Sequence, residues 1–373
     1  MASRRDILRA GGRSAAWSLP LLCGLPACRP SMGCEATYLA KSERPLKEQA
    51  EKRGLLFGAA VDRVALEPDR RYAETVITEC SLVTPENSMK WKSIRPTPGD
   101  FDFGDADWLV AFARDNGLQV HGHALAWHYQ LPDWFDATVD AGNAERFLVD
   151  HIETVVGRYA GRIRSWDVVN EAIESQSGRD DGLGVTPWLE RLGPGYIDLA
   201  YHAAAAADPD AVLVYNDYGL EYEGHWYDDR RSYLIDLLTG MVDRGVPVHA
   251  LGVQSHLRSH KRLDVDRFTR FLADVADLGL DLMITELDAR DHRLPADEAE
   301  RDCLVAATYR DYLDVMLDQP RLRSIGVWGL SDRYSWLTWH EPRDDGLPVR
   351  PLPFDHEMKR KPAWNAIANA LSA

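Results

Sequence analysis

Short apolar runs of strand length recur along the chain, and they constrain its fold more than any other feature. Most intervals between them hold an amphipathic stretch in which apolar residues return every three or four positions, as in residues 105–117 and 265–279. There are eight such runs, at residues 55–61, 81–87, 118–127, 165–171, 211–218, 250–257, 282–288 and 325–332. The pattern predicts strands that alternate with helices throughout this part of the chain.

Alternating apolar strands and helices are typical of a parallel sheet covered by helices. Eight such units in about 320 residues favour the α/β class, as a single (β/α)8 TIM barrel, over an open doubly wound sheet. The first run is not followed by the glycine-rich turn that binds phosphate in dinucleotide-binding folds. The 373 residues are 45% hydrophobic and 27% charged, which suits one large globular domain, and we place this domain at residues 46–373.

The N-terminus differs in kind from the rest. Arg4 and Arg5 stand next to each other and precede a mostly apolar stretch at residues 15–28, which is the order of the basic and hydrophobic regions of an export signal. The stretch is too short to span a membrane, and two prolines interrupt it. The paired arginines resemble a twin-arginine signal, so we expect residues 1–27 to direct export; an ordinary secretory signal is the alternative. Residues 28–45 are expected to be a polar linker.

Cys28 adds a question about this signal. Ala27 directly before it, with Leu25 two residues further back, resembles the cleavage site of a lipoprotein, which would attach a lipid to Cys28 and hold the protein to a membrane. Pro26 is unfavourable in such a site. The protein is therefore expected to be periplasmic, on the cell surface or extracellular, with or without a lipid anchor.

The formal net charge of −16 argues against nucleic acid as a partner, because phosphate backbones repel an acidic surface. Loss of residues 1–27 would remove four arginines and one aspartate, which makes the remainder more acidic still. Cys34, Cys80 and Cys303 show no CxxC spacing, so neither a zinc site nor a disulfide framework is predicted. Buried free thiols are the simpler expectation, and a bridge between Cys80 and Cys303 stays open.

Polar and aromatic side chains gather where the expected strands end. In a (β/α)8 barrel the C-terminal strand ends form the functional face, so these residues are expected at one mouth. Each alone has a structural explanation, such as capping of the next helix or packing in the core. Together they include two glutamates, three histidines, several amides and three tryptophans, Trp127, Trp328 and Trp336. This mixture suits a saccharide, because indole rings stack on sugar faces and polar groups bind hydroxyls.

Glu171 and Glu286, at the ends of the fourth and seventh runs, are the pair available for cleavage of a glycosidic bond. That reaction needs a protonated carboxyl group beside the leaving oxygen and a second, ionised carboxylate. The charge of Glu286 and a partly apolar setting would raise the pKa of Glu171, and His256 is the expected hydrogen-bond donor to Glu286. A twist or bulge at the strand end would bring Asn170 to the mouth beside Glu171, and Asp167 is expected to give structural support.

Six motifs, in their order and approximate spacing, resemble those of family-10 glycoside hydrolases, the endo-β-1,4-xylanases. They are TPENSMKW, WDVVNEA, YNDY, QSHL, ITELD and WGLSDRYSW, and the resemblance runs from about residue 46 to the C-terminus. The family implies a retaining mechanism on a (β/α)8 barrel, with Glu171 as acid/base and Glu286 as nucleophile. It implies xylan and xylo-oligosaccharides as substrates, and we expect a monomer without a cofactor or a metal.

The same resemblance implies which residues bind the sugars. Glu86, Asn87 and Lys90 would bind them on the non-reducing side of the scissile bond, and Tyr218 would lie toward the leaving group. The sites around the bond would be lined by His123, Trp127, Asn170, Gln254, His256, Trp328 and Trp336.

Two stretches depart from the family or lie where it varies. The family often has Asn after its NDY motif, and this chain has Gly219, which puts a hydrogen bond to the leaving sugar chain in question. Residues 338–355 fall in a variable part of the family. Their charges, from Glu341 to Asp345, are expected to form a solvated loop.

Three other functions fit part of the pattern. The same barrel and carboxylates would serve cellulose or mixed-linkage β-glucan, although bulky Trp328 and Trp336 near C5 of the sugar would exclude the hydroxymethyl group of glucose. A non-catalytic surface protein that binds glycan would need only the sugar-binding residues. A metal hydrolase would use His121, His123 and His128, but no closely spaced carboxylate accompanies them in the sequence.

Overall fold

The computed structural model describes residues 38–373. The predicted signal, Cys28 and the linker up to residue 37 lie outside the described residues, so the predictions for them stay predictions. The described strands are β1 (Leu56–Val61), β2 (Leu82–Pro85), β3 (Gln119–Gly122), β4 (Ser165–Asn170), β5 (Val212–Asp217), β6 (Ala250–Val253), β7 (His256–Arg258), β8 (Asp281–Arg290) and β9 (Leu322–Val327).

Helices follow most of these strands. The α-helices are α2 (Leu46–Glu51), α3 (Arg63–Leu66), α4 (Arg70–Glu79), α5 (Trp91–Ile94), α6 (Gly104–Asp115), α7 (Phe135–Thr138), α8 (Ala144–Arg158), α9 (Pro187–Leu192), α10 (Tyr196–Ala207), α11 (His225–Asp243), α12 (Val265–Asp277), α13 (Glu298–Met316), α14 (Leu337–His340) and α15 (Pro362–Leu371). A short 3-10 helix, η1 (Asp332–Tyr334), precedes α14.

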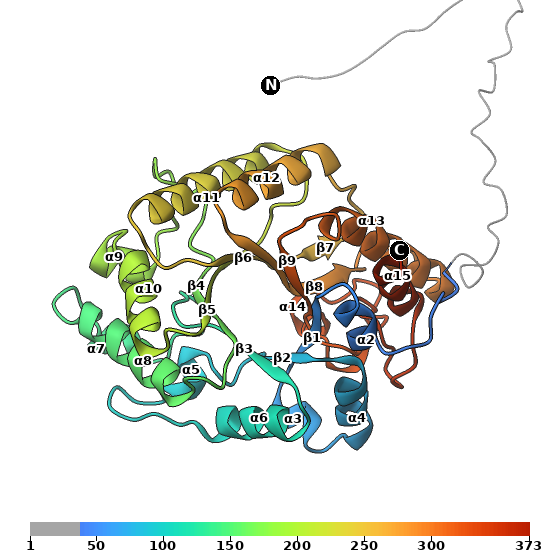
Figure 1. Cartoon of the computed structure of the whole chain (residues 1–373), viewed down its shortest axis with the longest axis horizontal. Helices are drawn as coiled ribbons and strands as arrows, with labels where there is room; N and C mark the ends of the chain where they lie inside the picture. The colour runs from blue at the N-terminus through green and yellow to red at the C-terminus, as the bar shows by residue number, and fades with distance from the viewer. Residues whose placement is uncertain (1–37) are drawn as a thin grey trace, which may run out of the picture.

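The strands form a closed parallel barrel. Each of β1 to β5 pairs with the next strand along the chain, β6 pairs with β8, β8 with β9, and β9 returns to β1. Figure 1 shows the strands as a ring with the helices outside it. The predicted (β/α)8 barrel is therefore confirmed. All C-terminal strand ends meet at one face, as parallel closure requires.

The sixth predicted strand, residues 250–257, was wrong in its continuity. It is divided into β6 and β7, because Ser255 adopts a φ of 65°, a left-handed conformation that interrupts an extended strand. The chain turns there, and β7 pairs in parallel with the last residues of β8. This break brings the polar residues between and after the two strands to the barrel mouth.

Four of the described α-helices, α4, α9, α12 and α13, begin at a residue whose side chain caps the first turn, and α12 shows how such a cap precedes an apolar stripe. The side chain of Asp264 accepts a hydrogen bond from the backbone N–H of Arg267 and so satisfies a donor that the first helical turn leaves free. The buried residues Phe268, Leu272 and Val275 follow at three- and four-residue spacing. They pack against the barrel and fix the helix outside it.

The charges from Glu341 to Asp345 do not all lie in the solvated loop that the sequence predicted. Asp344 and Asp345 are exposed, but Arg343 is only 7% exposed and donates to the carbonyl oxygens of Asp291 and Leu294. Arg350, further along the same stretch, is also buried and forms an ion pair with Asp302. The prediction was wrong because the carboxylates and carbonyls that these arginines bind belong to the β8–α13 region, about 50 residues earlier in the chain.

Two smaller findings concern cysteine and the membrane. Cys80 has a free thiol and is fully buried at the end of α4, so it is not bridged to Cys303. Among residues 38–373, no helix combines the length and the apolar character needed to cross a bilayer.

Candidate active site

A cleft of about 490 Å³ opens at the C-terminal ends of the strands. Almost all of the residues predicted to bind or cleave sugar line it: Glu86, Asn87, Lys90, His123, Trp127, Glu171, Tyr218, Gln254, His256, Glu286, Trp328 and Trp336. Asn170 is buried directly beside Glu171 and hydrogen-bonds to it. The structure thus brings together residues that lie up to 250 positions apart in the sequence.

Glu171 stands immediately after β4, where the strand is irregular. The register between β4 and β5 shifts at Asp167 and Val169, and Glu171 itself has a φ of 59°. This turn of the backbone brings the Glu171 side chain to the same side as Asn170, whose Nδ2 lies 3.2 Å from Glu171 Oε1. The bulge expected from the sequence is present, and it solves the problem that consecutive strand residues face opposite ways.

The Glu171 carboxyl group sits among hydrogen-bond donors but carries a raised pKa. Trp127 Nε1 donates to Oε2 at 2.9 Å, and Gln254 Nε2 donates to Oε1 at 2.8 Å. Burial is the largest influence and raises the pKa of Glu171 to about 7, with help from the charges of Glu286 and Asp217 and against the two donors. Near neutral pH this group can therefore hold a proton and release it.

Glu286, in β8, receives donors of a different kind. Asn216 Nδ2 donates to Oε1 at 2.7 Å, and His256 Nε2 lies 3.2 Å from Oε2. The other ring nitrogen of His256 lies 3.1 Å from Asp288 Oδ2. Burial would lower the pKa of His256, but Asp288 and Glu286 together raise it to about 9. His256 is thus a cation at neutral pH, and it contacts Glu286 as the sequence predicted.

Asn216 is a functional residue that the sequence reasoning missed. Its Nδ2 also lies 2.9 Å from Asn170 Oδ1, so one amide group links the surroundings of both glutamates. Thr285 Oγ1 donates to Asn216 Oδ1 at 2.7 Å and fixes the orientation of the amide. A signal was available, because Asn216 lies near the C-terminal end of β5, two residues before Tyr218, and the C-terminal strand ends form the functional face.

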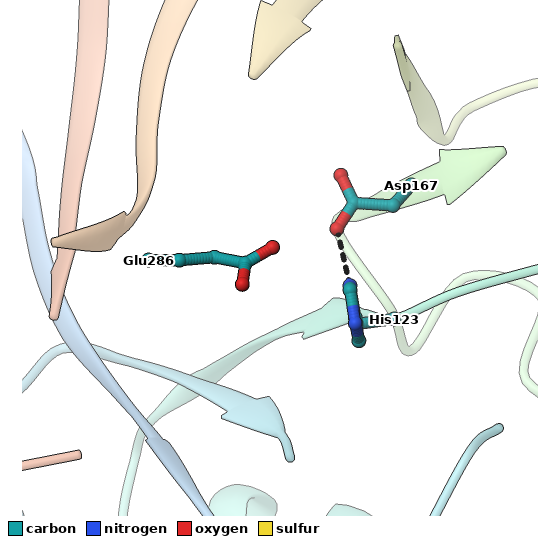
Figure 2. Close-up of side chains that lie close together, drawn as sticks. All are labelled: His123, Asp167 and Glu286. Carbon is teal, nitrogen blue, oxygen red and sulfur yellow. Dashed lines mark hydrogen bonds and ion pairs between the residues drawn. The ribbon is translucent and has the colours of Figure 1, made fainter. Parts of the chain in front are cut away.

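His123 and Asp167 lie close to Glu286. Figure 2 shows the Glu286 carboxylate directed toward the pair, and His123 Nδ1 is 2.8 Å from Asp167 Oδ2. The same oxygen is 3.0 Å from His121 Nε2. Burial would raise the pKa of Asp167, but the two histidines lower it to about 2, so it remains a carboxylate that orients them. Asp167 therefore has the supporting role that was expected.

This group also bears on the metal-hydrolase alternative. Ligand atoms of His123, Asp167 and Glu286 lie within 4.8 Å of one another, a spacing that an ion could bridge. However, the contacts with Asp167 already account for the arrangement of His121 and His123. His128, the third histidine of that alternative, does not belong to the group.

Residues after β2 form one end of the cleft. Asn87 Nδ2 donates to Asp62 Oδ2 at 2.7 Å, and Lys90 Nζ lies 5.0 Å from the ring centre of Trp127 and 5.7 Å from that of Trp328. Burial lowers the pKa of Lys90 against the attraction of Glu286 and other carboxylates. This end therefore combines aromatic rings with donors and acceptors at short range, which suits the faces and hydroxyls of a sugar.

Comparison with known proteins agrees with this geometry. The family model described as "Glycosyl hydrolase family 10" matches residues 45–370. The chain belongs to glycosyl hydrolase family 10. Among its relatives, endo-1,4-beta-xylanase B of Thermotoga neapolitana is 34% identical over 350 residues, which cover 92% of this chain and 96% of that protein. Endo-1,4-beta-xylanase 3 of Hypocrea jecorina is 35% identical over 325 residues, which cover 85% and 82%.

Solved structures of family-10 proteins superpose well on this chain. Xylanase 10B from Thermotoga petrophila RKU-1, in complex with xylobiose, has a TM-score of 0.80 and 34% identity, and the match covers 89% of this chain and 98% of that one. Native xylanase 10B from Thermotoga maritima has the same TM-score at 35% identity, with 88% and 98% covered.

The other end of the family-10 cleft explains the unusual Gly219. This residue has a φ of 71°, and a Cβ atom there would lie 2.5 Å from the Trp226 ring. Trp226 and Tyr218, with ring centres 6.1 Å apart, both line the cleft. The indole ring of Trp226 therefore occupies the space that a longer side chain at position 219 would need. Its contribution could not be read from the sequence, because α11 brings it back to the loop after β5.

Proposed function

We propose that this family-10 protein is an endo-1,4-β-xylanase that hydrolyses internal β-1,4 bonds of xylan with net retention. The single observation that carries the proposal is the pair of glutamates in opposite environments. Burial keeps a proton on Glu171 near neutral pH, whereas Asn216 and cationic His256 stabilise charge on Glu286. The names of the relatives in the family supply the substrate class.

In the first step, Glu286 Oε attacks the anomeric carbon as the glycosidic C–O bond breaks. Glu171 gives its proton to the leaving oxygen, so the departing sugar chain leaves as an alcohol. The product is a glycosyl ester on Glu286 and a carboxylate on Glu171. His256 and Asn216 hold the attacking carboxylate, and Asn170 beside Glu171 can bind the 2-hydroxyl of the sugar.

In the second step, Glu286 is an uncharged ester and Glu171 acts as a base. Esterification removes the negative charge of Glu286, which lowers the pKa of Glu171 and favours its ionised form. Glu171 then accepts a proton from water, and the resulting hydroxide attacks the anomeric carbon and breaks the ester bond. Two inversions at one carbon give retention, and Glu171 regains its proton.

The proposal is tested with Glu286→Ala and Glu171→Ala, and with Glu74→Ala on the exposed face of α4 as the matched control. Glu286→Ala should abolish release of reducing sugar from xylan, and Glu171→Ala should spare substrates with good leaving groups far more than xylan. Activity of Glu286→Ala near that of the wild type would overturn the mechanism. Binding of xylan by the wild type without any cleavage would instead support a non-catalytic glycan-binding protein.

The choice between xylan and glucose-based polymers rests on Trp328 and Trp336. Trp336 is held by a hydrogen bond of 2.7 Å from its Nε1 to Asp288 Oδ2, and Trp328 is nearly buried, so neither ring moves aside easily. Rings fixed near C5 of the bound sugar would exclude a hydroxymethyl group. We expect faster cleavage of xylo-oligosaccharides than of cello-oligosaccharides of the same length. Equal rates would replace the xylanase proposal with a broader β-glycanase.

We also propose that residues 1–27 export the protein through a twin-arginine route and that the mature protein is a monomer. The support is the sequence pattern around Arg4 and Arg5. Replacing both by lysine should leave the protein inside the cell, and light scattering should give the mass of one chain. Labelling with a radioactive fatty acid, with Cys28→Ala as control, would decide between the lipid-anchored and the released form.

A further inference from the structure

Two arginines stand side by side at the wall of the cleft where β7 and β8 end. Arg258 is the last residue of β7, Arg290 is the last residue of β8, and the two are direct partners in the parallel register. Both line the cleft that holds Glu171 and Glu286. Like charges on paired strand positions repel each other, so this arrangement costs stability unless something compensates it.

The compensation within the described residues is incomplete. Glu341 is the carboxylate that faces both arginines: its Oε2 is 2.7 Å from Arg290 Nη1, but its Oε1 is 4.0 Å from Arg258 Nη1. The Arg258 guanidinium makes no hydrogen bond to any residue from 38 to 373, and Arg290 Nε is buried without a partner. One carboxylate therefore faces two cations in a chain whose net charge is −16.

The neighbouring histidines show the same excess of positive charge. His260 and His292 have ring centres 5.5 Å apart, and Nδ1 of each is buried without a hydrogen-bond partner in the described part of the chain. Burial lowers the pKa of His292, and the charges of Arg293, Arg258 and Arg290 lower it further against the attraction of Glu341. The positive charge of the arginines thus extends to these neighbours, and Arg258 and Arg290 carry it to the wall of the cleft.

The position of the arginines relates them to the point of cleavage. His256, which contacts Glu286, is two residues before Arg258 on β7, so their Cα atoms are about 7 Å apart. The backbone N–H of Arg258 donates to the hydroxyl of Tyr222 at 2.6 Å, and Tyr222 lines the cleft on the Tyr218 side. A substituent on a sugar next to the scissile bond would reach this spot, whereas the main chain would pass beside it.

We propose that Arg258 and Arg290 bind the carboxylate of an acidic branch on the substrate, that is, a uronic acid attached to the main sugar chain. This inference rests on the proposed function, because it assigns the branch to a polymer held between Glu171 and Glu286. A guanidinium group matches a carboxylate with two parallel hydrogen bonds, and the free donors of Arg258 are available for them. A neutral branch of the same shape gains no such contact, so Arg258 and Arg290 favour a substrate whose branch carries a negative charge.

The test compares three oligosaccharides of equal main-chain length: one unbranched, one with a uronic acid branch, and one with the same branch after its carboxyl group is reduced to an alcohol. The wild type should show a kcat/KM about 5- to 20-fold higher for the acidic than for the reduced branch, and added salt should shrink the ratio. Arg258→Ala should bring the ratio near one, with a larger loss on the acidic branch than on the other two substrates. Arg258→Lys should keep part of it, and Arg270→Ala, an exposed position on α12 outside the cleft, should keep all of it.

The outcomes separate this inference from the function on which it rests. A ratio near one in the wild type would overturn the inference while cleavage of the unbranched chain upheld the proposed function. An equal loss on all three substrates in Arg258→Ala would also overturn it, since the arginine would then only support the cleft. If no substrate is cleaved, the proposed function fails, and calorimetric binding of the three oligosaccharides to Glu286→Ala still measures the preference. Free glucuronate as competitor shows whether the carboxylate alone suffices.

Discussion

Glu171 and Glu286 are the same side chain in two different settings, and the settings decide their chemistry. Glu171 is buried beside uncharged donors, Trp127 and Gln254, which do not outweigh burial, and its pKa is raised to about 7. Glu286 faces the protonated ring of His256 instead. The sequence allowed both environments to be predicted in kind, because Glu171, His256 and Glu286 all lie at or near the ends of predicted strands of one barrel. It did not reveal that the Asn216 amide donates both to Glu286 and to Asn170, the neighbour of Glu171.

The raised pKa of Glu171 predicts the alkaline limb of the pH profile. The protonated form is the active acid, so kcat/KM on xylan should fall as pH rises through about 7 in the free enzyme. In Glu171→Ala this limb should disappear for a substrate with a good leaving group. Glu86 also has a pKa raised to about 7, by burial and by Asp62, so Glu86→Gln is the control and should keep the limb. If the alkaline limb were lost in Glu86→Gln, it would report the titration of Glu86, and its assignment to Glu171 would be wrong.

His256 predicts a dependence of stability on pH. Its folded pKa of about 9 exceeds the ordinary value of 6.5, so its stabilisation is fully present below about pH 6.5 and is lost as pH rises through 9. The free energy of unfolding of the wild type should fall by about 1–3 kcal/mol more than that of His256→Gln between about pH 6 and pH 9.5. Denaturant titration of both proteins at the two pH values measures this. Parallel pH curves would contradict the ion contacts with Glu286 and Asp288.

At the scale of elements, the predicted strands and helices agree with the structure where a local pattern determines them. The runs at 165–171 and 211–218 became β4 and β5 because near-continuous apolar residues are typical of strands buried on both faces. The break between β6 and β7 could not be predicted, since it depends on the left-handed conformation of one serine, Ser255. The burial of Arg343 and Arg350 was missed for a similar reason: their partners come from a distant element.

Replacement of glycine by alanine is expected to have opposite effects on stability at two positions. Gly122, the last residue of β3, faces the Trp166 ring on β4, and a Cβ atom there would lie 2.1 Å from it, so Gly122→Ala should destabilise the barrel by about 2–4 kcal/mol. Gly157, within α8, has nothing within 4 Å of such an atom, so Gly157→Ala should stabilise by about 0.5–1 kcal/mol. Denaturant unfolding of both variants checks the contrast. Equal effects would mean that Trp166 can move away from β3.

At the scale of the whole molecule, the candidate active site and the contact between the first and last helices lie at opposite ends of the barrel. The site lies at the C-terminal strand ends, whereas α2 and α15, close to the two ends of the described chain, lie side by side next to α13 in Figure 1. Residues of the site could be predicted together because a parallel barrel gathers all its strand ends at one mouth. The seam between the first and last helices could not, because it depends on polar contacts between residues about 280 positions apart.

Glu79 at the end of α4 joins that seam, and it yields a prediction about the entire fold. Its buried carboxylate accepts hydrogen bonds from the backbone N–H of Leu46 at 2.8 Å, from Arg360 at 2.8 Å and from Trp364 Nε1 at 3.2 Å. Glu79→Ala leaves these donors without a partner and should lower the free energy of unfolding by about 2–4 kcal/mol.

Glu74→Ala, on the exposed face of the same helix, removes only a surface pair with Arg70 and should leave the stability nearly unchanged. Because Glu79 precedes β2, it lies at the end of the barrel opposite the cleft. The folded Glu79→Ala protein should therefore cleave substrate at the wild-type rate well below its melting temperature. A loss of kcat in protein that is still folded would contradict this separation, since it would mean that the seam of the first and last helices also holds the strand ends in place.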